Sequence, residues 1–278
     1  MPDPILQTVD LGKTYGARRR FWQKPANVPP ALADATLELR QGEILGVVGE
    51  SGSGKTTLAR CIALLERPDT GRVLFEGEDL TKLPEAALRR RRRYIQTVFQ
   101  DPYSSLNPRQ RIGDTLAEVM LVHGLASRGE QRDRVAALLE QVGLPATAAA
   151  NFPSAFSGGQ RQRICIARAL AAEPKVLIAD EPVSSLDVSV QAQIVNLLLD
   201  LKERLGLSVI FIGHDLQLIN FIAPRVIVML GGRIVETLPE GSSLADAKHD
   251  YTRALLQAVP TLEKLDAAYR LSQQQNMA

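Results

Sequence analysis

Eight consecutive residues of this sequence have the types and spacing needed to bind a phosphate group. The segment Gly49–Thr56 fits the pattern G-x-x-x-x-G-K-[ST] at every position. Glycines let backbone N–H groups turn inward around a β-phosphate, and the next helix adds a partial positive charge. Lys55 is expected to reach the β- and γ-phosphates, and the Thr56 hydroxyl to bind Mg²⁺. The expected nucleotide-binding residues here are Gly49, Ser51, Gly52, Ser53, Gly54, Lys55, Thr56 and Thr57.

Two adjacent carboxylates, Asp180 and Glu181, follow the short apolar run Val176–Ala179. Open parallel sheets bind ligands at the carboxyl ends of their strands, which is where these acids lie. Side by side they repel each other and lose hydration, so the arrangement is unfavourable without a cation or a catalytic task. We expect Asp180 to bind Mg²⁺ and Glu181 to polarise the attacking water. The alternative is a helix N-cap acid with an exposed neighbour, which weakens once the phosphate loop is accepted.

A second glycine turn, Phe156–Gln160, opens a helix but contains no lysine. It resembles the LSGGQ signature of ATP-binding cassette (ABC) ATPases, with Phe156 in place of the usual leucine. In that family the signature of one subunit covers the γ-phosphate bound by the other, through a backbone nest and a helix dipole directed at an anion. The resemblance implies that four residues contact a nucleotide held by a second subunit: Ser157, Gly158, Gly159 and Gln160.

Three further segments resemble motifs of the same family in the same order. Gln100 matches the Q-loop glutamine, which the resemblance implies reaches both Mg²⁺ and the attacking water. Residues 184–187 match the D-loop. His214 ends an apolar run and matches the switch histidine that contacts the γ-phosphate. Taken alone, His214 would be read as a core or loop histidine; its place at the carboxyl end of a predicted strand favours the catalytic reading.

An aromatic residue near the N-terminus completes the resemblance. Tyr15 fits the position that stacks on adenine in this family. Phe21 or Trp22 are alternatives for that role, and Tyr15 could instead cap a sheet. The implied cofactors are ATP and Mg²⁺.

Hydrophobic periodicity predicts the elements that must position these residues. Ile44–Val48, directly before the phosphate loop, is apolar throughout, as expected of a strand buried on both faces of a parallel sheet. Val176–Ala179 and Val209–Ile212 have the same character, and a helix with apolar residues from Ile194 to Leu205 separates them. Strand, helix and strand of these lengths imply a right-handed parallel crossover.

Residues 101–153 turn to helical spacing, which predicts a separate helical lobe, whereas Ile5–Val9 and Ala35–Leu39 read as strands. With the family resemblance, the expected fold class is α/β: a P-loop NTPase ABC cassette with a RecA-like parallel core, an antiparallel β subdomain and an α-helical subdomain. We expect one ABC ATPase domain over 1–278, divided into antiparallel β and P-loop core (1–99), helical subdomain (100–157), the rest of the core with signature helix, Walker B strand and switch (158–240), and a short C-terminal helical extension (241–278).

Composition excludes several protein classes. The 278 residues carry 33 Lys and Arg against 31 Asp and Glu, and 45% are hydrophobic, which supports a folded core. No signal peptide or membrane-spanning run is recognisable. Cys61 and Cys165 are far apart without Cys-x-x-Cys spacing, so we expect two core residues and no disulfide, zinc site or iron–sulfur cluster.

Five consecutive arginines, Arg89–Arg93, are the strongest local charge feature. Such a run is typical of nucleic-acid or acidic-lipid binding. No aromatic residues interleave with it to stack on bases. We therefore favour a solvated helix end that leads into a strand over Tyr94–Phe99.

One phosphate loop and one signature imply that the active unit is a dimer, of this chain or with a sister subunit. No heptad run fills the gap between the loop and the carboxylate pair, which disfavours chromosome-maintenance relatives. A helical lobe of this size resembles the one that ABC transporters dock against their membrane subunits. The alternative function is a soluble ABC-type ATPase that acts on nucleic acid.

Four segments resemble the oligopeptide, dipeptide and nickel importer branch: 18–30, 101–109, 181–191 and 250–256. The last of these also reads as an ordinary amphipathic helix. Ser154-Ala155 departs from the branch, where an acidic residue often precedes the aromatic one. The resemblance implies two transmembrane permease subunits, a second ABC ATPase, indirectly an extracytoplasmic solute-binding protein, and no nucleic acid. It implies a peripheral location on the cytoplasmic face of the plasma (inner) membrane, and peptide, opine, nickel chelate or oligosaccharide as cargo.

Overall fold

The computed structural model describes residues 3–16, 29–184, 186–242 and 246–258. Most of the segment 18–30 lies outside the described residues. So do Phe21, Trp22, Ser185 of the D-loop match, and the part of the C-terminal extension after 258. Within the described residues, no helix is both long and apolar enough to cross a membrane.

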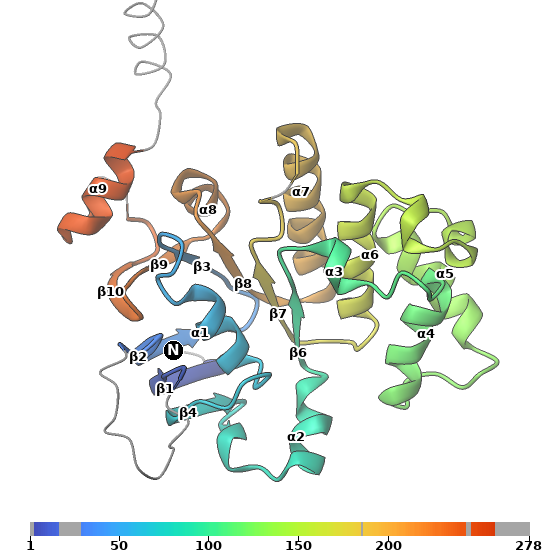
Figure 1. Cartoon of the computed structure of the whole chain (residues 1–278), viewed down its shortest axis with the longest axis horizontal. Helices are drawn as coiled ribbons and strands as arrows, with labels where there is room; N and C mark the ends of the chain where they lie inside the picture. The colour runs from blue at the N-terminus through green and yellow to red at the C-terminus, as the bar shows by residue number, and fades with distance from the viewer. Residues whose placement is uncertain (1–2, 17–28, 185, 243–245, 259–278) are drawn as a thin grey trace, which may run out of the picture.

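A six-stranded sheet forms the centre of the fold, in the order β10-β9-β3-β8-β7-β6 (Figure 1). Five strands run parallel and only β10 is antiparallel, to β9. Every residue of β3, β7 and β8 is buried, which explains their unbroken apolar runs. The strands are β3 (Ile44–Val48), β6 (Ile95–Val98), β7 (Val176–Asp180), β8 (Ser208–Gly213), β9 (Arg225–Leu230) and β10 (Arg233–Leu238).

A four-stranded antiparallel sheet packs against the other side of the first helix. Its order is β2-β1-β4-β5, and β2 alternates buried and exposed residues as a sheet with one buried face requires. α1 (Lys55–Ile62) lies between the two sheets, and its Leu58 belongs to their shared core. The strands are β1 (Leu6–Lys13), β2 (Leu32–Leu39), β4 (Thr70–Phe75) and β5 (Glu78–Asp79).

A helical lobe lies at one end of the molecule, beyond β6 (Figure 1). The helical spacing predicted over residues 101–153 is confirmed, and apolar residues at that spacing are buried: Ile112, Leu116, Met120 and Val135. Its helices are α3 (Pro102–Ser105), α4 (Ile112–Val122) and α5 (Gln131–Gln141), followed by 3₁₀ turns at Ala146–Ala150 and Pro153–Ala155. α6 (Gly158–Leu170) and α7 (Val188–Leu205) pack together between this lobe and the sheet, and the parallel crossover from β7 to β8 is as predicted.

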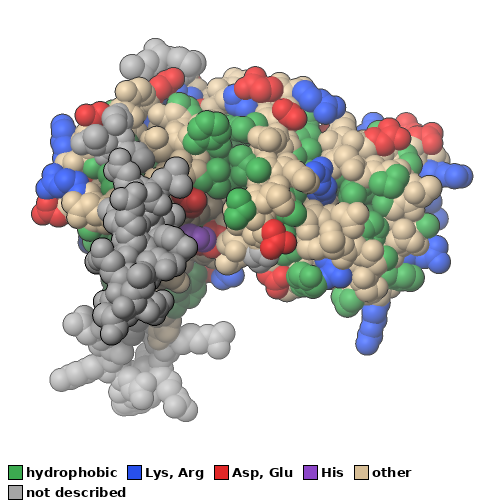
Figure 2. All heavy atoms as spheres, turned by 90° about the horizontal axis from the view of Figure 1, so that it is seen from above, with side chains coloured by type: hydrophobic (Ala, Val, Ile, Leu, Met, Phe, Trp, Pro, Cys, Tyr) green, Lys and Arg blue, Asp and Glu red, His purple; other side chains and the backbone are tan. Residues whose placement is uncertain are grey.

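The arginine run ends a helix, as expected from the sequence. α2 (Glu85–Arg92) contains the first four arginines, Arg93 is its C-cap residue, and β6 begins at Ile95. Arg91 pairs with Glu78, and Arg93 both pairs with Glu173 and lies over the Tyr94 ring. Figure 2 shows acidic and basic side chains scattered together over one face of the molecule, in keeping with the near-zero net charge.

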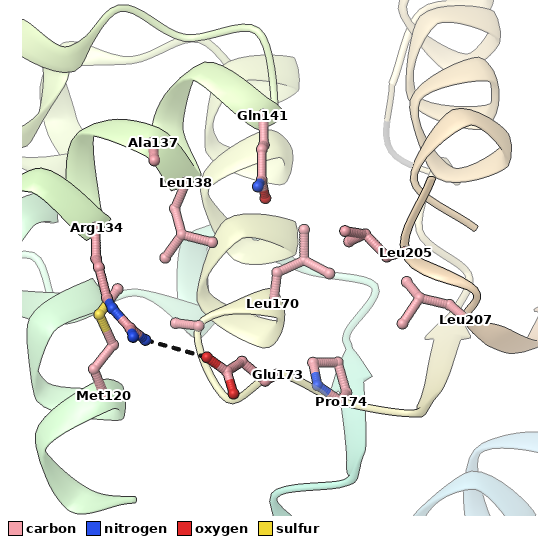
Figure 3. Close-up of a pocket in the computed structure, with 11 residues that line it drawn as sticks. Met120, Arg134, Ala137, Leu138, Gln141, Leu170, Glu173, Pro174, Leu205 and Leu207 are labelled. Carbon is pink, nitrogen blue, oxygen red and sulfur yellow. Dashed lines mark hydrogen bonds and ion pairs between the residues drawn. The ribbon is translucent and has the colours of Figure 1, made fainter. Parts of the chain in front are cut away.

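A hollow of about 350 Å³ lies between the helical lobe and the core, at the edge opposite the carboxyl ends of β7 and β8 (Figure 3). Leu170, Leu205 and Leu207 line it, and the ion pair of Arg134 with Glu173 crosses its rim. Glu173 has a backbone φ of 53°, in the left-handed region that non-glycine residues rarely adopt.

Both cysteines are core residues, as predicted. Cys61 of α1 and Cys165 of α6 are buried, and neither forms a disulfide. Burial raises the pKa of each thiol to about 11. Among the described residues no cluster of three or more His, Cys, Asp or Glu side chains could hold a metal ion.

Candidate nucleotide site

A cleft of about 640 Å³ opens above the phosphate loop. Its walls come from the carboxyl ends of neighbouring strands: the loop after β3, Gln100 after β6, Glu181 after β7 and His214 after β8. This is the sheet edge at which the sequence places the ligand. The lining residues are Ala31, Glu50, Ser51, Gly52, Gly54, Lys55, Thr56, Thr57, Gln100, Glu181 and His214.

The phosphate loop turns directly into α1. Gly54 is the N-cap residue at φ 101°, and a Cβ there would lie 2.5 Å from the carbonyl oxygen of Ala31, so only glycine fits. Lys55 is buried, and its Nζ donates to the carbonyl oxygens of Gly49, at 2.6 Å, and Glu50, at 2.9 Å. Burial lowers the pKa of this ammonium group, while the charges of Glu181 and Asp180 act in the opposite direction.

Thr56 lines the cleft, and Asp180 lies buried directly behind it, within hydrogen-bond distance of its hydroxyl. The Thr56 Oγ1 donates to Oδ1 of Asp180 at 3.5 Å, and Asp180 is only 4% exposed. Burial raises the pKa of Asp180; the Thr56 hydrogen bond opposes this rise and the Glu181 charge adds to it. A hydroxyl and one carboxylate fit Mg²⁺, which keeps several waters and takes further ligands from the phosphates of its substrate.

Two polar side chains converge on one oxygen atom of Glu181. Nε2 of Gln100 donates to Oε2 of Glu181 at 3.0 Å, and Nδ1 of His214 lies 3.7 Å from the same oxygen. Glu181 has φ 47°, and its N–H donates to the carbonyl of Ile212 in β8 at 3.0 Å. Such a backbone outlier is costly and persists where the surroundings impose it, which is common at functional sites.

The signature residues do not line this cleft. Ser157 and Gln160 are exposed at the start of α6, where they form a capping box: Oγ of Ser157 accepts from the Gln160 N–H, and Oε1 of Gln160 accepts from the Ser157 N–H. A Cβ on Gly159 would lie 2.5 Å from Cγ1 of Val190 in α7, so this glycine allows close approach of the two helices. Within one chain, the loop and the signature are therefore not brought together.

Tyr15 is 43% exposed and is not among the residues that line the cleft. Its hydroxyl donates to the carboxylate of Glu66. The structure thus places its ring at the surface near β1, and adenine stacking on it stays a prediction.

Sequence reasoning missed two lining residues, Ala31 and Glu50. Ala31 lies in the segment that leads into β2. Two residues later, the Ala33 N–H donates to the carbonyl of Gly232 and holds this segment in place. The Gly232 N–H in turn donates to the carbonyl of Ser53 in the loop. The turn between β9 and β10 therefore supports the phosphate loop. No local sequence motif predicts this contact. For Glu50, the signal was available, since it is one of the variable positions of the loop pattern.

Comparisons with known proteins identify the family of the chain. The family model described as ABC transporter matches residues 32–184. The dipeptide transport ATP-binding protein DppF of Escherichia coli K12 is 44% identical over 271 residues, which cover 98% of this chain and 81% of that protein. A putative peptide import ATP-binding protein of Brucella ovis is 46% identical over 258 residues, covering 93% of this chain and 79% of the relative.

Among solved structures, a dimeric post-hydrolysis state of the ATP-binding cassette MJ0796, bound to ADP and Pi, superimposes with a TM-score of 0.74 at 29% identity. The match covers 86% of this chain and all of that chain. Fold, motif order and extended sequence identity all agree, and the chain belongs to the ABC transporter family of ATPases.

Proposed function

We propose that this chain is the ATP-binding and ATP-hydrolysing subunit of an importer that takes up peptides or a related small solute through membrane permease subunits. The convergence of Gln100 and His214 on Glu181, at the mouth of the phosphate loop, carries the hydrolytic part of the proposal. The transport part is supported by the similarity to DppF, which covers almost the entire chain.

In this proposal the nucleotide phosphates occupy the loop, where Lys55 contacts the β- and γ-phosphates. Thr56, Asp180 and Gln100 would hold Mg²⁺, which neutralises charge on the phosphates. Glu181 accepts a proton from the water that attacks the γ-phosphorus, while the bond to the β-phosphate oxygen breaks. His214 contacts the γ-phosphate and, with Gln100, orients the Glu181 carboxylate.

The signature of a second cassette completes each site. Two observations support this proposal: Ser157–Gln160 do not line the cleft of their own chain, and the chain resembles a dimeric cassette structure. Val188, directly after the D-loop, is 82% exposed despite its apolar side chain, as expected at a surface that a partner covers. ATP binding closes the dimer, and hydrolysis reopens it.

We further propose two permease subunits as partners, an extracytoplasmic solute-binding protein as an indirect one, and a peripheral place on the cytoplasmic face of the plasma (inner) membrane. Opening and closing of the cassette dimer then drive the permease between inward-facing and outward-facing states. The nucleic-acid alternative is not favoured, because Arg91, Arg92 and Arg93 each pair with an acid of the same chain.

Mass spectrometry of the copurifying proteins tests this function. An affinity-tagged Glu181→Gln chain is expressed in its native cell and purified in detergent and ATP. Recovery of two permeases with a cassette dimer is the expected result. Recovery of nucleic-acid-processing proteins without membrane subunits would show that the ATPase serves a different machine.

A further inference from the structure

One peptide unit of the phosphate loop is held from both sides. It joins Gly49 to Glu50 and contributes the carbonyl of the first residue and the N–H of the second. The Gly49 carbonyl oxygen accepts from Nζ of Lys55 at 2.6 Å. The Glu50 N–H donates to the hydroxyl oxygen of Tyr251 at 3.0 Å. In a trans peptide the C=O and N–H lie in the peptide plane and point in opposite directions, so Lys55 and Tyr251 hold opposite edges of the same plane.

This peptide unit needs such support because of the glycine at its start. A Cβ on Gly49 would lie 2.3 Å from the carbonyl oxygen of Met229 and 2.6 Å from Oγ of Ser53, so no other residue fits. Glycine leaves the backbone torsions before the Glu50 N–H less restricted than any other residue would. A hydrogen bond to that N–H limits rotation of the plane and keeps the Gly49 carbonyl directed at Lys55.

Tyr251 is itself well anchored. It belongs to α9 (Asp250–Ala258), at the end of the molecule opposite the helical lobe (Figure 1). The carboxylate of Glu236 in β10 accepts from the N–H groups of Lys248, at 2.6 Å, and His249, at 3.3 Å, and so fixes the entry to the helix. Tyr251 and Leu255 are partly buried against the main hydrophobic core.

We propose that Tyr251 is a positioning residue of the nucleotide site: its hydroxyl orients the Gly49–Glu50 peptide, and through it Lys55, for binding the β- and γ-phosphates. The hydroxyl hydrogen-bonds to a backbone N–H of the loop, and Tyr251 is not among the residues that line the cleft. In this way α9 influences nucleotide affinity although it lies outside the nucleotide-binding motifs. The proposal rests on the nucleotide site of the proposed function but not on its cargo or membrane partners.

The test compares Tyr251→Phe with the parent in the isolated full chain. The substitution keeps the ring and its packing and removes only the hydroxyl. Calorimetric titration with ADP and Mg²⁺ is expected to show a dissociation constant raised about threefold to tenfold, the range for one hydrogen bond of ordinary strength. The KM for ATP should rise by a similar factor, while kcat at saturating ATP changes less than about twofold, because the lost interaction serves ground state and transition state alike.

Tyr94→Phe is the matched control. Tyr94 stacks on Phe75 and directly precedes β6, at the sheet edge opposite the loop, so this substitution should leave ADP binding unchanged. Hydrogen exchange of the Glu50 amide gives an independent readout, and it should become faster in Tyr251→Phe. An unchanged ADP dissociation constant in a folded Tyr251→Phe chain would overturn the proposal. So would unchanged protection of the Glu50 amide. Neither readout requires a permease or a transported solute, so failure here is distinguishable from failure of the importer function.

Discussion

His214 and Glu181 end neighbouring parallel strands, and Nδ1 of the histidine lies 3.7 Å from Oε2 of the carboxylate. Glu181 is held in a left-handed backbone conformation, and its exposed partner His214 stands at the mouth of the cleft. The same carboxylate oxygen accepts from Gln100, 3.0 Å away. Two neighbouring strand ends thus place polar side chains around one carboxylate oxygen of the third, Glu181, in the wall of the cleft.

Glu181→Gln should abolish most hydrolysis while leaving ATP binding intact. The amide keeps the shape of the side chain but cannot accept the proton of the attacking water, and general-base catalysis contributes about 10²–10⁴-fold. Phosphate release measures the rate, and light scattering after gel filtration in ATP should show a stable dimer. Glu203→Gln, at a 75% exposed side chain, serves as the control. Turnover equal to that of the parent chain would remove Glu181 from the role of base.

Lys55→Ala should abolish nucleotide-dependent activity. The ammonium group is buried and bridges two loop carbonyls, so its loss removes both the phosphate contact and the cross-link of the loop. Binding of ADP by calorimetry and phosphate release from ATP are the two readouts. Lys202→Ala is the matched control, because Lys202 lies in α7 and pairs with its neighbour Glu203. Retention of parental binding and turnover by Lys55→Ala would contradict the assignment.

Gly159→Ala should destabilise the packing of α6 on α7. The added Cβ would lie 2.5 Å from Cγ1 of Val190, and overpacking of this kind costs about 1–3 kcal/mol. Chemical denaturation measures the loss, and the double variant with Val190→Ala should recover most of it. If hydrolysis recovers together with stability, Gly159 serves only packing. If stability returns without hydrolysis, the glycine also acts in the signature, as the family resemblance implies.

The central sheet was predictable because burial alone dictates its strands. The prediction for Ile44–Val48 is confirmed residue for residue, since a strand covered on both faces is apolar throughout. The prediction for the first strand, Ile5–Val9, is wrong at its end, since β1 continues to Lys13. Asp10 there has φ 48°, and the register shifts between Val9 and Gly12, so an irregularity that no hydrophobic pattern encodes carries the strand onward.

In the candidate site too, some residues could be located from the sequence and others could not. Lys55, Thr56 and the carboxylates Asp180 and Glu181 were predictable because each belongs to a local pattern with a stated chemistry. The contact between Glu50 and Tyr251 was not, since it joins residues 201 positions apart and depends on how α9 docks. Sequence motifs indicate the groups expected to contact a ligand. The residues that hold these groups in place depend on tertiary packing, which no local motif encodes.

The two cysteines should resist alkylation in the folded chain. Burial raises their pKa to about 11, so at pH 8 only about one thiol in a thousand is ionised. Iodoacetamide followed by mass spectrometry should label Cys61 and Cys165 slowly in buffer and rapidly in denaturant. The unfolded thiols ionise near their ordinary pKa of about 8.5, so the folded state holds extra protons from there to about 11. Stability should therefore fall as the pH rises through that window, and rapid labelling of the folded chain at pH 8 would contradict the burial.

Glu173, at the junction of the helical lobe and the core, combines two ion pairs with a strained backbone conformation (Figure 3). Substitutions there compare the free-energy contributions of the two. Its carboxylate pairs with Arg134 of α5 at 3.2 Å and with Arg93 at 3.5 Å, but half of the side chain is exposed, so each pair contributes about 0–1 kcal/mol. Its left-handed backbone costs a non-glycine residue about 1–2 kcal/mol. Glu173→Gly and Glu173→Ala both delete the ion pairs, yet only glycine also relieves the backbone. The free energy of unfolding should therefore be higher for Glu173→Gly than for Glu173→Ala by about 1 kcal/mol, as measured in urea. Equal values for the two variants would mean that the backbone conformation at this junction carries no strain.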